Sequence, residues 1–133
     1  MVLVDTSVWV DFFNGVDTAE VNELDVLLGS ARIMIGDLIL AELLQGFTPN
    51  VDYRRARNLL ADVPYADLVG RNVALAAADN YRRLRSRGIT VRKTIDVIIG
   101  TFCILNDHEL LHSDRDFDLM AQNLGLQIYA RTR

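Results

Sequence analysis

Apolar and polar residues follow one another along the chain in short blocks, and these blocks predict an alternation of strands and helices. Short apolar runs bounded by polar residues or glycine are typical of buried strands, whereas apolar residues at every third or fourth position are typical of helices. We therefore predict strands at residues 1–4, 32–35, 65–69, 109–112 and 126–130. We predict a helix that begins at residues 8–10, and further helices at 21–28, 38–44, 53–60, 71–87, 94–105 and 117–124.

This order of elements indicates the fold class. Strands that alternate with helices, without hairpin signals between them, predict an α/β fold with a central parallel sheet covered by helices on both faces. With 133 residues, of which 50% are hydrophobic, the chain is long enough for one domain with a substantial core. No apolar run approaches the ~18 to 20 residues of a membrane span, and the N-terminus lacks the pattern of a signal peptide. We therefore expect a cytoplasmic protein without a membrane segment.

Charge and cysteine content narrow the possible functions. The net charge of −4 argues against a protein dedicated to nucleic-acid binding, and a single cysteine, Cys103, excludes a disulfide framework or a cysteine zinc site. The charges are unevenly distributed. Residues 1–50 hold eight acids and one base, Arg32. Residues 82–93 hold no acid and six bases: Arg82, Arg83, Arg85, Arg87, Arg92 and Lys93.

The sequence from His108 to His112, HELLH, matches the H-E-x-x-H pattern of zinc metalloproteases. Such a site needs both histidines one turn apart on a helix, so that both reach one ion at about 2.0 to 2.1 Å. Here the preceding helix is expected to end at residues 106–107, which leaves the five residues extended and the two side chains roughly 13 Å apart. The chain has no third histidine. We therefore interpret HELLH as a chance match, with His112 at the end of a strand.

Five acidic residues stand out because of where they fall among the predicted elements. Asp5 directly follows the first strand, and Asp114 and Asp116 follow the fourth, so both groups lie at carboxyl ends of parallel strands, where such sheets place their ligand sites. Glu42 and Asp96 lie within apolar helices. A buried carboxylate without a partner costs several kcal/mol, so each of these residues requires an explanation.

Each acid has a structural explanation and a functional one. Asp5 and Asp114 could cap helices, Glu42 could lie on a solvated helix face, and Asp96 could be favoured by the dipole in the first turn of its helix. Taken together, the acids could instead converge in one crevice. Oxygen ligands without histidine or cysteine select Mg²⁺ or Mn²⁺.

The residues around these acids resemble a known family. Four stretches are similar in order and spacing to the PIN-domain ribonucleases, and most closely to the VapC toxins of bacterial toxin–antitoxin pairs: VDTSVW at 4–9, LAELLQG at 40–46, TID at 94–96 and HSDRDF at 112–117. No single stretch is specific, but the four in register cover essentially the whole chain. The resemblance implies a three-layer α/β/α PIN-like fold, with residues 1–133 forming a single PIN domain.

The resemblance also implies an activity. It implies an endoribonuclease that uses Mg²⁺, or Mn²⁺, to cleave structured RNA such as tRNA or rRNA, and leaves a 5′ phosphate. The family's acidic quartet carries over to Asp5, Glu42, Asp96 and Asp114, as metal ligands and catalytic residues. Asp116 is a fifth candidate that the sequence does not rank against Asp114. Thr6 and Ser113 would orient carboxylates or water through their hydroxyls.

Partners follow from the same resemblance. The six bases of residues 82–93 are candidates for RNA phosphate contacts, because an acidic pocket itself repels RNA. They could instead be a solvated face that pairs with an antitoxin or with the acidic N-terminal half of the chain. A VapB-like antitoxin is implied as the partner, together with toxin homodimers and toxin–antitoxin hetero-oligomers. Apolar residues on the N-terminal helices are expected either to form the partner groove or to belong to the core: Trp9, Phe12, Phe13, Leu43, Leu44 and Phe47.

Three other functions are compatible with parts of the pattern. A catalytically silent PIN-like scaffold would be expected to have lost at least one acid, and none is missing. A receiver-type phosphoacceptor needs a second acid beside Asp5 and a lysine on a later strand, whereas Lys93 is the only lysine. A haloacid-type phosphatase needs D-x-D at the first strand, and position 7 is Ser7. The nuclease interpretation fits the sequence best.

Overall fold

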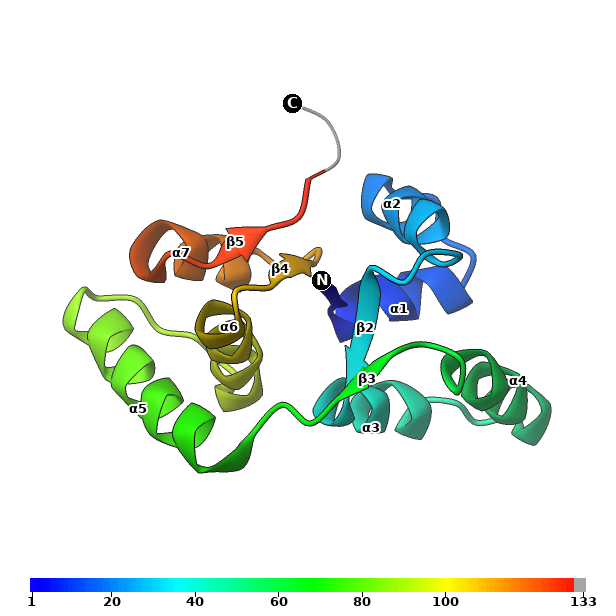
Figure 1. The fold of residues 1–133 in the computed structure, drawn as a ribbon, viewed down its shortest axis with the longest axis horizontal. Coiled ribbons are helices and arrows are strands. Elements are labelled where there is room, and N and C mark those ends of the chain that lie inside the picture. The colour runs from blue at the N-terminus through cyan, green and yellow to red at the C-terminus, as the bar shows by residue number, and fades with distance from the viewer. Residues whose placement is uncertain (131–133) are drawn as a thin grey trace.

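The computed structural model describes residues 1–130 as a five-stranded sheet with helices between the strands (Figure 1). The strands are β1 (Val2–Val4), β2 (Ile33–Gly36), β3 (Tyr65–Ala66), β4 (Glu109–Leu111) and β5 (Gln127–Ile128). The helices are α1 (Thr6–Phe13), α2 (Ala19–Leu27), α3 (Asp37–Gln45), α4 (Asn50–Leu60), α5 (Gly70–Ser86), α6 (Thr94–Asn106) and α7 (Arg115–Leu124).

The sheet is parallel throughout, and its strand order is β3-β2-β1-β4-β5. The first strand is central, with Leu3 paired to Met34 of β2 on one side and to Leu110 of β4 on the other. The chain therefore winds outward from β1 to β3, and then crosses back to β4 and winds outward in the other direction. In sheets of this kind, ligands bind beyond the carboxyl ends of the two strands at which the winding reverses, here β1 and β4.

The helices form two groups that cover the sheet. Helix α1 contacts α2 and α3, and α3 contacts α4, whereas α5 and α7 pack against α6. Figure 1 shows α1 to α4 gathered on one side of the molecule and α5 to α7 on the other. The result is the three-layer α/β/α architecture expected from the sequence, with a PIN-like order of elements.

The core lies between these layers and explains why the central strands are apolar throughout. Every residue of β1 and of β2 is buried, as a parallel sheet covered on both faces requires. Trp9 of α1, Phe117 of α7 and Ile99 of α6 are among the largest side chains that are fully buried. Together they fix α1, α6 and α7 against the sheet, and these helices carry most of the acids discussed below.

All predicted strands and helices are present, with differences at their ends. Helix α1 begins at Thr6, because Asp5 caps it by accepting a hydrogen bond from the amide of Ser7. The third strand is only two residues long, Tyr65–Ala66. The predicted end of the sixth helix is confirmed: α6 stops at Asn106, and Asp107 adopts the left-handed conformation with φ 57°. Within residues 1–130 no helix is long and apolar enough to cross a membrane.

Candidate metal centre

A cavity of about 370 Å³ lies beyond the carboxyl ends of β1 and β4, where the winding of the sheet reverses. Its lining is acidic and comes from residues far apart in the sequence: Asp5, Thr6, Ser7, Val10, Asp11, Glu42, Lys93, Asp96, Ser113 and Asp114. Four of the five predicted acids therefore meet in one cavity. The fifth, Asp116, joins them through its contacts with Asp96 and Asp114.

Asp5 is held in place by the turn that follows β1. Its side chain is 5% exposed, and its Oδ2 accepts hydrogen bonds from both the Ser7 amide, at 3.1 Å, and the Ser7 hydroxyl, at 2.6 Å. The two donors fix the orientation of the carboxylate. Asp5 therefore caps α1 and lines the cavity, so the structural and the functional interpretations both apply to it.

Glu42 reaches the cavity from α3, and a hydrogen bond fixes it there. The hydroxyl of Thr6 donates to Oε1 of Glu42 at 2.9 Å, across 36 positions of sequence. This contact is the carboxylate-orienting role that was predicted for Thr6. Because α1 begins directly after β1, the residue next to Asp5 is placed to orient an acid from a neighbouring helix.

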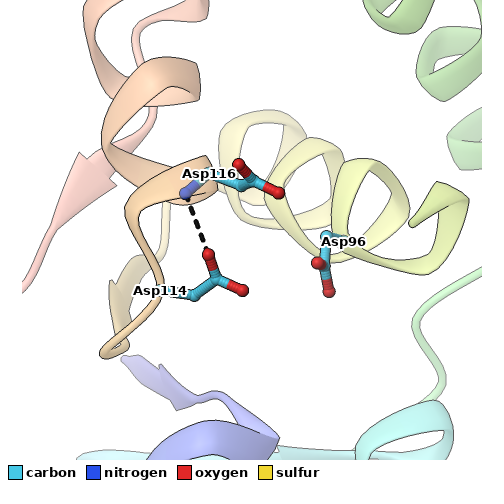
Figure 2. Close-up of side chains that lie close together, drawn as sticks. All are labelled: Asp96, Asp114 and Asp116. Atoms are coloured by element: carbon cyan, nitrogen blue, oxygen red, sulfur yellow. Dashed lines mark hydrogen bonds between the residues drawn. The ribbon is translucent and has the colours of Figure 1, made fainter. Parts of the chain in front are cut away.

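Three aspartates from α6 and α7 come closer together than the other acids. Asp96, Asp114 and Asp116 each present a carboxylate oxygen within 4.8 Å of the other two. Figure 2 shows Asp114 and Asp116 at the start of α7, across from Asp96 on α6. The amide of Asp116 donates to Oδ1 of Asp114 at 3.0 Å, so Asp114 also caps α7. Asp96 and Asp116 are both buried.

The electrostatic strain of this arrangement falls on Asp96. Burial, together with the charges of Asp5, Asp114 and Glu42, raises the pKa of its carboxyl to about 7, while Lys93 acts in the opposite direction. Among residues 1–130, no amide or side chain donates a hydrogen bond to the Asp96 carboxylate. A buried carboxylate among like charges is the condition that a bound cation relieves.

The donor set fits a hard divalent cation. The cluster of Asp96, Asp114 and Asp116 consists of three carboxylates, and Mg²⁺ binds in proteins through one or two carboxylates while keeping several waters. Each of the three carboxylates offers one oxygen that lies within 4.8 Å of the oxygens of the other two. Thiolate or imidazole ligands, which would select zinc, are absent from this cluster. The residues present therefore suit Mg²⁺ or Mn²⁺.

Two hydrogen bonds join the loop after β1 to the loop after β4. The Asp5 amide donates to the Leu111 carbonyl at 2.9 Å, and the Ser113 amide donates to the Ser7 hydroxyl at 3.2 Å. Ser113 thus contributes its backbone, and its exposed side chain makes no hydrogen bond within residues 1–130. The role predicted for the Ser113 hydroxyl stays a prediction. Ser7, which was not among the predicted site residues, accepts the hydrogen bond from the Ser113 amide and donates one to Asp5. Ser7 lies two residues after an aspartate at the end of a strand, and this position was the feature of the sequence that could have pointed to it.

The HELLH segment is extended, as predicted, and does not form a zinc site. His108 lies between α6 and β4 and stacks on Phe102, with ring centroids 5.7 Å apart. Burial lowers its pKa. His112 lies at the other end of β4 and is buried against Phe117. The strand between them separates the two rings, so they do not share a metal.

The basic residues have four different surroundings. Lys93 lines the acidic cavity itself. Arg87 is held by α7, because its Nη1 donates to the Asn123 carbonyl at 2.8 Å. The side chain of Arg85 lies over the ring of Tyr81, 6.0 Å from its centroid. The remaining three bases are exposed on α5 and on the loop before α6: Arg82, Arg83 and Arg92.

The apolar residues proposed for a partner groove divide into two sets. Trp9 and Leu43 are 0% and 3% exposed, so the groove prediction is wrong for these two, which belong to the core. Phe12, Phe13 and Phe47 are half-buried and stack edge to face, with centroids 5.2 and 5.4 Å apart along the row. We call these three residues the aromatic surface. They line a second cavity of about 510 Å³ between α1, the end of α3 and α4. Leu44 is half-buried beside Tyr53 and Tyr65, in another cavity.

Comparisons with known proteins agree with this geometry. The PIN domain family matches residues 2–123. Ribonuclease VapC11 of Mycobacterium tuberculosis is 32% identical over 129 residues, which cover 96% of each chain. VapBC2 from Rickettsia felis, solved bound to a DNA fragment from its promoter, superposes with a TM-score of 0.77 at 18% identity, over 97% of this chain and 98% of that one. VapC20 of Mycobacterium tuberculosis, a sarcin-ricin loop cleaving toxin, superposes with a TM-score of 0.65 at 17% identity, over 90% and 94%.

Proposed function

The chain belongs to the PIN domain family, and from that premise we propose that it is a metal-dependent endoribonuclease that acts as the toxin of a type II toxin–antitoxin pair. One observation carries the proposal. Five carboxylates, one of them with a pKa raised to about 7, converge beyond the carboxyl ends of the two central strands. A cluster of carboxylates destabilises the folded state, and binding of a cation explains why the chain has one. We take residues 1–133 as one PIN domain.

Asp96, Asp114 and Asp116 would hold the ion, which we propose is Mg²⁺, with Mn²⁺ as a substitute. When bound, the ion supplies stabilisation of the charge that develops on the scissile phosphate, and it lowers the pKa of a water molecule. Asp5 and Glu42 complete the acidic ring of the cavity. Hydrolysis by water at phosphorus would leave a 5′ phosphate and a 3′ hydroxyl.

The residues around the cluster have separate tasks in this proposal. The Thr6 hydroxyl holds Oε1 of Glu42, which leaves Oε2 free to accept a hydrogen bond from the attacking water. Ser7 orients Asp5 through two hydrogen bonds. Lys93 is the base that lines the cavity, so it is placed to contact a phosphate of the substrate. Backbone phosphates that flank the cleaved bond would reach Arg92 and the exposed arginines of α5.

We propose structured RNA, tRNA or rRNA, as the substrate class. VapC20, which shares this fold, is a toxin that cleaves the sarcin-ricin loop, and this supports an RNA loop as the target here. An acidic cavity flanked by bases on one side suits a strand whose reacting phosphate enters the metal site while its neighbours contact the basic residues. The cytoplasm, where tRNA and ribosomes are found, is the proposed location.

Purified protein and Mg²⁺ test the activity directly. Total RNA incubated with the protein should acquire new 5′-phosphate ends at a small number of positions, and mapping of these ends identifies the substrate. EDTA and Asp96→Asn should each abolish the new ends. Cleavage that persists equally in both controls would refute the metal-dependent nuclease.

We also propose a VapB-like antitoxin as the partner, with toxin homodimers within the hetero-oligomer. The aromatic surface supports this, because half-buried aromatic side chains beside a cavity of about 510 Å³ are typical anchors for an apolar partner segment. Phe47→Ala should weaken inhibition by the antitoxin while the toxin stays folded and active. Trp9→Ala is the matched control, since it empties the core and should destabilise the fold by about 3 to 5 kcal/mol. Full inhibition of Phe47→Ala would refute this surface.

A further inference from the structure

His112 has no place in the chemistry proposed above, yet it is one of the few polar residues buried in this protein. It is 8% exposed, and its ring lies against Phe117 with centroids 5.1 Å apart. Its Nδ1 accepts a hydrogen bond from the backbone amide of Asp114 at 3.0 Å. A buried imidazole in contact with the main chain of a proposed metal ligand suggests a supporting role.

The hydrogen bond defines the form of the ring. An Nδ1 that accepts from an amide carries no proton, so the neutral ring has its proton on Nε2. Nε2 lies 3.3 Å from Oδ1 of Asp118, in a contact that falls short of hydrogen-bond alignment. The Asp118 carboxylate is 59% exposed, so it can attract the Nε2 proton but holds it loosely. The contact to Asp114 is therefore the stronger constraint on the ring.

His112 begins a series of two turns that lead into the metal cluster. A side-chain acceptor that binds the amide two residues ahead makes a compact turn, the geometry that aspartate and asparagine adopt at helix starts. His112 makes this contact with the Asp114 amide, and Asp114 in turn makes it with the Asp116 amide. The first turn fixes the backbone of Asp114, and the second sets its carboxylate beside Asp116.

We infer that His112 is a positioning residue for the metal cluster, on the basis that its Nδ1 fixes the Asp114 amide and so directs the Asp114 carboxylate toward Asp96 and Asp116. The inference rests on the proposed metal-dependent function. It assigns a role to the second histidine of HELLH that is neither ligation nor proton transfer. Asp118 supports the ring from outside the cluster.

Three substitutions of His112 distinguish the effect of its hydrogen-bond acceptor from the effect of its ring shape. His112→Phe keeps the ring packed on Phe117 and removes the acceptor. His112→Asn restores an acceptor for the amide two residues ahead, and His112→Gln offers only a longer side chain that reaches toward Asp118. Mn²⁺ affinity measured by calorimetry should fall about 10- to 100-fold in His112→Phe and His112→Gln, and should recover to within a few-fold of the original in His112→Asn.

A measurement without metal keeps this inference separate from the nuclease activity. In ¹⁵N-labelled protein without metal, the Asp114 amide should exchange with solvent slowly in the original protein and in His112→Asn, and quickly in His112→Phe. Equal exchange in all three proteins, or unchanged Mn²⁺ affinity in a folded His112→Phe, would overturn the inference. If the original protein cleaves no RNA but shows this pattern, the positioning role stands and the proposed function fails.

Discussion

The wall of the acidic cavity built by β1, α1 and α3 supplies hydrogen bonds to its carboxylates, whereas the wall built by α6 and α7 leaves its carboxylates facing one another. On the first wall, Ser7 donates twice to Asp5, and Thr6 donates to Glu42. On the second, one backbone amide donates to Asp114, and Asp96 receives no hydrogen bond within residues 1–130. Asp5 and Asp96 are nevertheless buried to similar degrees, at 5% and 7% exposure.

The difference shows that two carboxylates buried to a similar degree can have very different surroundings. Hydrogen-bond donors can replace the water that an acid loses on burial, and Asp5 has them. Asp96 lacks them, and its pKa rises to about 7. The α6–α7 wall is therefore the one that gains most from a cation. The β1–α1–α3 wall holds its geometry with or without one.

Paired substitutions on the two walls give the largest expected effect. Asp5→Asn and Asp96→Asn should each lower ribonuclease activity by roughly 100-fold or more, because each removes a negative charge that holds the proposed metal ion. Thermal stability without metal should move in opposite directions at pH 8. Asp96→Asn should stabilise the fold by relieving a strained charge, and Asp5→Asn should destabilise it by about 1 to 2 kcal/mol by weakening charge-assisted hydrogen bonds.

If both variants raise thermal stability, or both lower it, the proposed difference between the two walls is wrong. Calorimetric melting in EDTA measures this, and single-turnover cleavage measures the activity. From the sequence we expect Asp5→Asn to leave stability unchanged or higher, because it removes one like charge from the cluster. The two hydrogen bonds from Ser7 reverse that expectation.

The second-largest expected effect is the pH dependence of the free energy of unfolding. The folded pKa of Asp96 lies at about 7, above its ordinary value of 3.8, so between these values the native state binds the proton that the unfolded chain releases. The contribution of Asp96 to stability without metal should therefore be greatest below pH 4, fall by on the order of a few kcal/mol as the pH rises to about 7, and then level off. Urea unfolding in EDTA from pH 4 to pH 8 measures this fall, which Asp96→Asn should flatten. Saturating Mg²⁺ should restore most of the loss at pH 8.

A smaller loss of activity is expected from a substitution on the β1–α1–α3 wall. Thr6→Val keeps the shape of the side chain and removes the donor to Glu42, so activity should fall about 10-fold. Mn²⁺ affinity should change little, because the ligand cluster lies on the other wall. Thr6→Ser, which keeps the hydroxyl, is the control and should retain most of the activity. A large loss of metal affinity in Thr6→Val would show that the two walls act as one unit.

The smallest effect is expected away from both walls. His108→Ala removes a ring that stacks on Phe102 at the opposite end of β4, so activity should stay within a few-fold and Mn²⁺ affinity should not change. Added Zn²⁺ should not produce proteolysis. Stoichiometric zinc that binds the original protein and is lost in His108→Ala would restore the metalloprotease interpretation.

Local patterns in the sequence were enough to predict the elements of this fold and the acids of its site. Strand runs, helix spacing and the stops at Asn106 and Gly125 are local properties, and the structure confirms them. The order of the strands depends on contacts between distant segments, which no local pattern specifies. Burial is also non-local, so Trp9 and Leu43 could not be separated from Phe47 by their apolar character. Ser7 and His112 act through hydrogen bonds whose partners only the fold reveals.

The position of β1 between β2 and β4 has a consequence for synthesis of the protein on the ribosome. A single domain generally folds as a unit, and one edge of β1 lacks its partner until late in synthesis. That edge is completed by β4, and the same late segment brings Asp114 and Asp116. A nascent chain without this segment therefore lacks both the complete sheet and two of the five acids. If the proposed activity is correct, a toxin of this design harms no RNA near the ribosome that makes it until its last quarter has been translated.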